Sequence, residues 1–157
     1  MIKKFIFLLF IINATLSCGF TPALKVVGNS QTDLKVYYEI KDSSYIAQDT
    51  LRSYLQNTTE SHAEYIAIIK VQESESAVNI DSNGSVLEYK IEILIEYEII
   101  DNTNDVMIHR SQTRGFANYD VSSSEYNNNL IKNEASKTAI TEAAQLMSIM
   151  IQSKISE

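Results

Sequence analysis

Apolar and polar residues alternate with a period of two in the middle of the chain. Between residues 88 and 99 the odd positions are Tyr or Ile, and the even positions are Glu, Lys or, once, Leu. Successive side chains of a β-strand point to opposite faces, so this segment predicts a strand with one apolar and one polar face. We expect its sheet to meet a core on one side and water or a polar cavity on the other.

Three further segments are typical of strands because they are rich in β-branched, aromatic or other apolar residues. They lie at residues 34–40, 65–71 and 106–119. The Asn83–Gly84 pair favours a tight hairpin turn before the alternating strand, because a tight hairpin needs positive φ angles. A polar turn at 101–105 follows that strand. Gly115 lies within the last strand and is interpreted as a candidate bulge.

Two segments have the apolar spacing of a helix, at about 44–56 and from 125 to about 153. The second helix carries a stripe of small and apolar residues that we expect to face the sheet. The stripe consists of Ala135, Ala139, Ala143, Leu146, Met147 and Met150. The order β-α-β-β-β-α predicts an α+β fold. It is a two-layer sandwich in which a mostly antiparallel four-stranded sheet carries both helices on one face.

The first 17 residues predict a secretory signal peptide. Lys3 and Lys4 precede an apolar run of roughly a dozen residues, whereas a transmembrane helix needs about 20. The segment Thr15-Leu16-Ser17-Cys18 then resembles a bacterial lipobox, which implies that Cys18 is lipidated and becomes the first residue of the mature protein. An ordinary signal peptide followed by an incidental cysteine is the alternative. Cys18 is the chain's single cysteine, which excludes an intrachain disulfide.

Composition separates the rest of the chain into a tether and one domain. Residues 18–33 have little periodicity and predict a lipidated tether, and residues 34–157 predict a single periplasmic α+β domain. Without residues 1–17 the chain has eleven Lys and Arg against twenty Asp and Glu, a formal charge of −9. Such acidity argues against a nucleic-acid partner, because affinity for phosphates comes mainly from Lys and Arg.

The sequence offers no constellation for catalysis. Neither His62 nor His109 lies three or four residues from a cysteine or the other histidine, so no metal site is predicted. The chain has no Gly-x-Ser-x-Gly elbow and no glycine-rich phosphate loop. We therefore expect no catalytic residue, no cofactor and no enzymatic activity.

The basic residues of the last strand allow two interpretations. If the turn places Ile100 opposite Val106, Glu96 faces Arg110 and Glu92 faces Arg114, and these pairs stabilise the sheet. The alternative is a binding site for an anionic head group, because guanidinium groups bind phosphate through two hydrogen bonds. Arg110 and Arg114 would form that site, and the adjacent strands could add Lys70 and Lys90.

Several segments together resemble the LptE family of lipopolysaccharide-assembly lipoproteins. They are Cys18-Gly19-Phe20-Thr21-Pro22, the alternating strand at 88–99, the segment from Arg114 to Tyr119, and Tyr126 at the opening of an Ala-rich terminal helix. The resemblance implies a lipid-anchored protein on the periplasmic side of the outer membrane. It further implies a plug in an LptD-type β-barrel that helps the barrel to assemble and to deliver lipopolysaccharide to the outer leaflet.

The resemblance implies that basic residues contact lipopolysaccharide. The mature chain is instead strongly acidic, so it differs from the family in this respect. A second functional hypothesis is a stand-alone periplasmic lipoprotein that binds a small amphiphile or supports the envelope. An enclosed apolar pocket between sheet and helices would favour this second hypothesis. A filled core and an exposed polar face would favour the plug.

Overall fold

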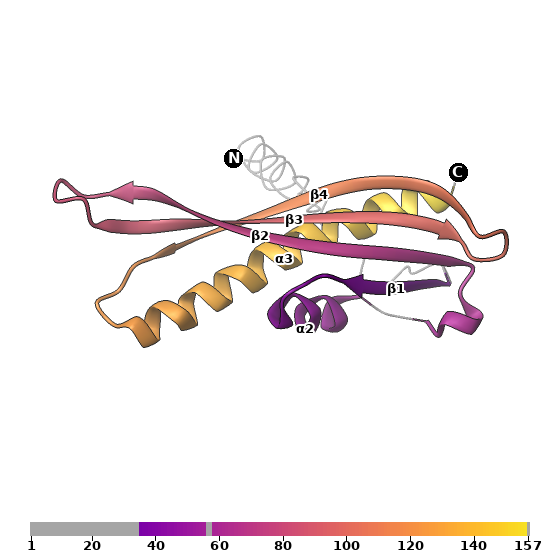
Figure 1. Cartoon of the computed structure of the whole chain (residues 1–157), viewed down its shortest axis with the longest axis horizontal. Helices are drawn as coiled ribbons and strands as arrows, with labels where there is room; N and C mark the ends of the chain where they lie inside the picture. The colour runs from indigo at the N-terminus through magenta and orange to yellow at the C-terminus, as the bar shows by residue number, and fades with distance from the viewer. Residues whose placement is uncertain (1–34, 56–57, 157) are drawn as a thin grey trace, which may run out of the picture. The chain divides into compact units, whose positions relative to one another are not determined.

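The computed structural model describes residues 35–55 and 58–156 (Figure 1). The elements are β1 (Val36–Lys41), α2 (Tyr45–Tyr54), a one-turn 3₁₀ helix η1 (Glu60–His62), β2 (Tyr65–Ile80), β3 (Val86–Asp101), β4 (Val106–Asp120) and α3 (Glu125–Ile155). The predicted order of four strands and two helices is confirmed, with η1 in addition. The predicted signal peptide, Cys18 and the whole of the predicted tether at 18–33 lie outside the described residues.

The sheet is mixed, because one of its three strand pairings is parallel. This pairing corrects the prediction of a mostly antiparallel sheet. Its strand order is β1-β2-β3-β4. β2 pairs with β3 and β3 with β4 in antiparallel fashion, whereas β1 and β2 are parallel. The parallel pair follows from α2, which carries the chain back to the starting end of β1 before β2 begins.

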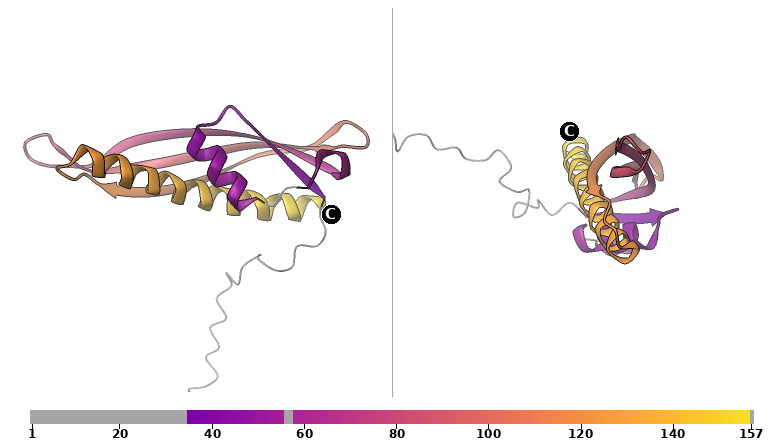
Figure 2. Two further views of the ribbon diagram at one scale, coloured as in Figure 1. Left: turned by 90° about the horizontal axis from the view of Figure 1, so that it is seen from below. Right: turned by 90° about the vertical axis from the view of Figure 1, so that its left-hand side faces the viewer.

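Both helices cover the same face of the sheet (Figures 1 and 2). The odd-numbered residues of β3 point into this layer, and Ile91, Ile93, Ile95 and Ile99 are completely buried there. Serine side chains cap both helices: Ser44 Oγ accepts a hydrogen bond from Ala47 N at 3.2 Å, and Ser124 Oγ accepts one from Asn127 N at 3.4 Å. The alternation seen in the sequence thus places the core between β3 and the helices. No helix of residues 35–55 and 58–156 covers the even-numbered face of β3, which is called the uncovered face below.

The buried stripe of α3 differs from the predicted one at two positions. Ala135, Ala139, Ala143 and Met147 are buried as predicted, but Leu146 and Met150 are 45% and 43% exposed. The remaining buried residues of the helix are Ser136, Ile140, Ala144 and Ile151. These lie on the side of the stripe away from Leu146, and α3 also packs against α2. The buried face of α3 therefore extends to that side, and Leu146 and Met150 lie outside it.

Gly115 is not a bulge, because it pairs with Ile93 in a regular stretch of the ladder. The irregularity lies at the other end of β4, where Ile99 pairs with His109 and Ile100 with Met107, so that Ile108 is the extra residue. A Cβ atom on Gly115 would lie 2.0 Å from the carbonyl oxygen of Ala139. The glycine therefore allows α3 to approach the sheet closely.

Candidate functional site

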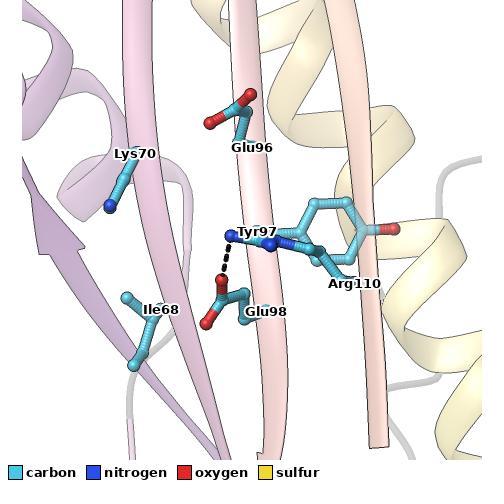
Figure 3. Close-up of a pocket in the computed structure, with 6 residues that line it drawn as sticks. All are labelled: Ile68, Lys70, Glu96, Tyr97, Glu98 and Arg110. Atoms are coloured by element: carbon cyan, nitrogen blue, oxygen red, sulfur yellow. Dashed lines mark ion pairs between the residues drawn. The ribbon is translucent and has the colours of Figure 1, made fainter. Parts of the chain in front are cut away.

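The uncovered face of the sheet carries the basic residues that the sequence predicted as candidates. Lys70 of β2 lies opposite Glu96 of β3, and Arg110 of β4 lies opposite Glu98. With Ile68 and Tyr97 these four residues line a shallow hollow (Figure 3). The hollow thus combines two cations and two carboxylates, supplied by three neighbouring strands.

Arg110 is held by an ion pair within this hollow. Its Nη2 atom lies 2.5 Å from Glu98 Oε1, and 67% of the arginine side chain remains exposed (Figure 3). The prediction that Glu96 faces Arg110 is wrong. Asp101 rather than Ile100 lies opposite Val106, and Ile108 is an extra residue that bulges out of the ladder. The register therefore places Glu98 across from Arg110 and Gln112 across from Glu96.

Arg114 forms an ion pair with Glu92, as the sequence predicted, but along a diagonal. Its Nη1 atom lies 3.1 Å from Glu92 Oε1, whereas its direct neighbour across the ladder is Leu94. Diagonal neighbours on one face of a sheet are within reach of long side chains. More than half of the Arg114 side chain is exposed, so this pair and the Arg110 pair each contribute on the order of 0.2–1 kcal/mol.

The two lysines differ in their surroundings. The Lys90 ammonium lies 4.1 Å from the centre of the Phe116 ring, a cation–π contact on the uncovered face. Lys70 lies at the hollow beside Glu96. Among the described residues no carboxylate lies within 4.0 Å of either ammonium. The four basic residues are thus brought to one face, but glutamates between them divide that face into alternating positive and negative charge.

Sequence reasoning missed a second polar cluster, on the helix-covered side of the sheet. Lys132 Nζ of α3 lies 2.6 Å from Glu75 Oε2 of β2, and the Tyr119 hydroxyl of β4 donates a hydrogen bond to Glu75 Oε1. Ser136 Oγ also donates to Glu73 Oε1 at 3.1 Å. A signal was present, because Glu73 and Glu75 continue the odd-numbered, inward-facing positions of the strand beyond Val71.

The electrostatics of this cluster follow from its contacts. Partial burial raises the pKa of Glu75, but the hydrogen bonds from Lys132 and Tyr119 outweigh burial and leave the pKa below its usual value. For Tyr119, burial and the adjacent Glu75 carboxylate both raise the pKa. The carboxylate is therefore stabilised in its charged form and the phenol in its neutral form. The cluster joins β2, β4 and α3.

Metal ligands and membrane spans were also sought in the described part of the chain. Within residues 35–55 and 58–156 no three His, Cys, Asp or Glu side chains gather in a way that could hold a metal ion. His62 Nδ1 lies within hydrogen-bonding distance of the Thr59 and Ser61 hydroxyls, and the His109 ring packs beside Tyr97. None of the helices in these residues combines the length and apolarity needed to cross a bilayer.

Solved structures with the same fold include several bacterial lipoproteins. A candidate lipoprotein from Caulobacter crescentus has a TM-score of 0.63 at 16% identity, covering 78% of this chain and 90% of its own. Rare lipoprotein B from Shewanella oneidensis has a TM-score of 0.57 at 10% identity, covering 77% and 96%. A minor lipoprotein from Acinetobacter baumannii has a TM-score of 0.54 at 12% identity, covering 76% and 91%. At these identities the likeness shows the fold alone.

The family of this chain is identified by comparison of its sequence with family models. No curated protein matches it significantly. The family model for LptE, described as lipopolysaccharide-assembly, matches residues 35–155. The match spans β1 to the end of α3, which is nearly all of the described domain, and it agrees with the resemblance seen in the sequence. The chain belongs to the LptE family of lipopolysaccharide-assembly proteins.

Proposed function

We propose that this chain is an outer-membrane lipoprotein that plugs and helps assemble an LptD-type β-barrel, and so aids delivery of lipopolysaccharide to the outer leaflet. The observation that carries the proposal is the family match over residues 35–155. The sheet supports it, because one face carries charges of both signs and no helix of the described part of the chain covers it. The inside of a large outer-membrane barrel is polar, so such a face suits its surroundings.

The packing between sheet and helices favours the plug over a carrier of a small amphiphile. A ligand pocket commonly needs about 300 Å³ or more of mostly apolar space. The described residues line one hollow of about 350 Å³, near the end of β4, but it is open to solvent and Ile131 is the single aliphatic residue among Glu88, Asn118, Tyr119, Asp120 and Ile131. Between sheet and helices the side chains of Ile93, Ile95, Ile140 and Met147 are completely buried against one another. The hollow around Arg110, in contrast, lies on the charged face. We therefore expect the chain to act through its surface and to catalyse no reaction.

Cys18 is the proposed membrane anchor. It is the chain's only thiol and follows the signal-like segment of residues 1–17. Each buried CH₂ of an acyl chain contributes roughly 0.8 kcal/mol, so two or more chains on one residue would hold the domain at the membrane. Residues 19–33 would then link the anchor to the domain on the periplasmic side.

The basic residues of the uncovered face are proposed as a weak contact for anionic lipopolysaccharide head groups. Arg110 and Arg114 remain more than half exposed while paired, and each can turn part of its guanidinium fork to a phosphate. Lys70 and Lys90 could add charge from the adjacent strands. Glu92 and Glu98 compete for the same arginines, so we expect this contact to be weaker than binding to a purely basic patch.

Co-purification tests the main proposal. The full chain, tagged at its C-terminus and produced with its cognate LptD-type barrel, should be recovered with that barrel from detergent extracts. An unrelated lipidated protein with the same tag serves as the control and should recover no barrel. Recovery of the chain without a barrel at every detergent strength would overturn the proposal.

A further inference from the structure

The outer edge of β4 is an open strand edge of 15 residues. β4 stands last in the order β1-β2-β3-β4, so no strand of the described residues pairs with its outer side. The opposite edge consists of β1, which has only 6 residues and carries the Glu39–Lys41 ion pair, and then of β2 from Val71 to Ile80, which no described strand pairs on its outer side. That stretch of β2 contains Glu73 and Glu75 and no basic residue, so it differs in charge from β4. Short, charged edges resist pairing with other chains, whereas a long open edge presents a template for another strand.

One hydrogen bond shows which backbone groups face outward. Phe116 N donates to Glu142 Oε2 of α3 at 2.8 Å, so the N–H of Phe116 points away from β3. In an antiparallel strand the N–H and C=O of one residue point to the same side and alternate along the chain. The backbone groups of Arg110, Gln112 and Arg114 therefore also point to the open edge. Glu142 occupies this edge at Phe116, which leaves the stretch from Arg110 to Arg114 open.

The open stretch has an apolar neighbour on one side. Leu146 and Ile149 follow Glu142 by four and seven residues on α3, so they continue the same side of the helix past the edge. Both side chains are at least 40% exposed. These backbone groups have no partner strand among the described residues, and they lie between an apolar helix side and the uncovered, charged face of the sheet.

Charge indicates the kind of strand that fits. Residues 106–119 contain Arg110 and Arg114 but no Asp or Glu, although the mature chain has a formal charge of −9. Pairing of two copies of β4 about Gln112 would place Arg110 of each copy opposite Arg114 of the other. Like charges directly opposite each other destabilise a sheet, so a second copy is a poor partner and an acidic segment is a good one.

We propose that the β4 edge from Arg110 to Arg114 binds an extended segment of the barrel partner, which joins the sheet as a fifth strand. This inference rests on the proposed function. Residues of the bound segment would alternate along its length. Apolar side chains would contact Leu146 and Ile149, and acidic or polar side chains would lie beside the arginines. A closed barrel wall has no free edge, so the segment belongs to a loop or a terminal extension of the barrel protein.

Proline at position 112 tests the edge directly. Gln112→Pro removes one outward N–H and hinders strand addition, yet proline is tolerated on edge strands where the N–H faces solvent. Gln112→Ala keeps the N–H and is the matched control. In the full chain produced with its barrel, Gln112→Pro should lower barrel recovery about two- to tenfold relative to Gln112→Ala. Equal thermal unfolding of the two variants shows that the domain itself is intact.

A second pair of variants keeps the test independent of proline. Ile149→Glu removes an apolar side chain beside the edge and places there a charge that repels an acidic segment, whereas Tyr126→Glu places the same charge near the other end of α3, where the residue is 77% exposed. Only Ile149→Glu should reduce recovery. A photo-crosslinking residue at position 112 should join the chain to a loop or terminal segment of the barrel.

The outcomes separate the two proposals. If the unmodified chain binds the barrel and the Gln112→Pro and Gln112→Ala variants recover it equally, the proposal that the β4 edge binds the barrel is overturned. The proposed function is then unaffected. A crosslink from position 112 to a second copy of the chain also overturns the edge proposal. If the unmodified chain recovers no barrel, the proposed function fails and the edge proposal fails with it.

Discussion

At the scale of single residues, Gly115 sets the distance between β4 and α3. A Cβ atom there would lie 2.0 Å from Ala139 O and 2.8 Å from Ala143 N, both of which are backbone atoms. Backbone of a packed helix cannot move aside as the end of a flexible side chain can. The same close approach lets the Thr113 hydroxyl donate to Ala143 O at 2.9 Å. One missing side chain therefore fixes the sheet-to-helix packing at this point.

Gly115→Ala should destabilise the domain by about 3 kcal/mol or more, because the helix must move away from the sheet. Urea unfolding followed by circular dichroism measures the change. Gly84→Ala is the control: Gly84 has a φ of +85° with no atom near the new Cβ, so only backbone strain of about 1 kcal/mol applies. A smaller loss for Gly115→Ala than for Gly84→Ala would contradict this account of the packing.

The paired arginines should matter more for binding than for stability. Arg110→Ala combined with Arg114→Ala should lower the free energy of unfolding by no more than about 1 kcal/mol per exposed pair. Binding to vesicles that contain lipopolysaccharide should fall several-fold, because two guanidinium groups are lost. Lys35→Ala removes an exposed pair with Glu64 elsewhere and should leave binding unchanged. A loss of stability with unchanged vesicle binding would show that the two arginines only stabilise the sheet and do not bind head groups.

At the scale of elements, polar contacts hold the far half of β2 to α3. From Gln72 to Asn79 the residues of β2 are exposed, so apolar burial contributes little there. Glu75 instead bonds to Lys132 of α3 and Tyr119 of β4, and Glu73 bonds to Ser136 of α3. Tyr119 also stacks on Tyr89 of β3, with 5.5 Å between ring centres. The end of the long hairpin is therefore joined to the helix by charge and hydrogen bonds.

The Glu75 contacts should stabilise the fold in a pH-dependent way. Because the folded-state pKa of Glu75 lies below its usual value of 4.5, the stabilisation is present above that pH and is lost as pH falls through the folded-state pKa. At pH 7 Glu75→Gln should cost roughly 1 kcal/mol, and the difference from the unmodified chain should vanish at low pH. Urea unfolding between pH 7 and pH 3 measures it.

Glu64→Gln is the matched control for this titration, since Glu64 pairs with Lys35 in a largely exposed position. Its cost at pH 7 should be smaller, because solvent screens the exposed pair. A pH-independent cost of Glu75→Gln would show that the carboxylate acts through packing rather than charge. On the alkaline side, the raised pKa of Tyr119 predicts stability that is present below pH 10 and lost as pH rises through the folded-state pKa of the phenol.

At the scale of the whole molecule, the net charge opposes attachment to the membrane and the proposed lipid anchor favours it. With residues 1–17 removed, as proposed, the chain has a formal charge of −9 and an anionic membrane surface would repel it. Acyl chains on Cys18, the proposed anchor, would act through apolar burial, which is insensitive to that charge. Cys18 is therefore expected to carry membrane attachment alone.

Cys18→Ser should abolish incorporation of a labelled fatty acid and leave an unprocessed or unlipidated precursor. Ser17→Ala keeps a small residue before the cysteine and should retain the label. Gel electrophoresis of the immunoprecipitated chain after metabolic labelling distinguishes the two variants. A label that persists on the Ser variant would place the lipid on another residue and refute the anchor.

The sequence alone was sufficient for the features that depend on neighbouring residues. Alternation at 88–99 predicted which face of β3 is buried, because side-chain direction in a strand is a local property. The order of strands and helices was also predicted. The ion pair of Arg114 with Glu92 forms as predicted, but along a diagonal, because the predicted register was wrong. The family resemblance rested on the same kind of short segment, and the match over residues 35–155 confirmed it.

Tertiary structure decided what depends on contacts between distant segments. The parallel pairing of β1 and β2 follows from the return path through α2, and the Arg110–Glu98 pair follows from a bulge at Ile108 that no local pattern specifies. Which side of α3 is buried depends on where the sheet and α2 meet it, and Leu146 and Met150 fall outside that area. Gly115 is required by a helix that comes from elsewhere in the chain. Each depends on how whole elements meet, and a residue's neighbours in sequence do not determine that geometry.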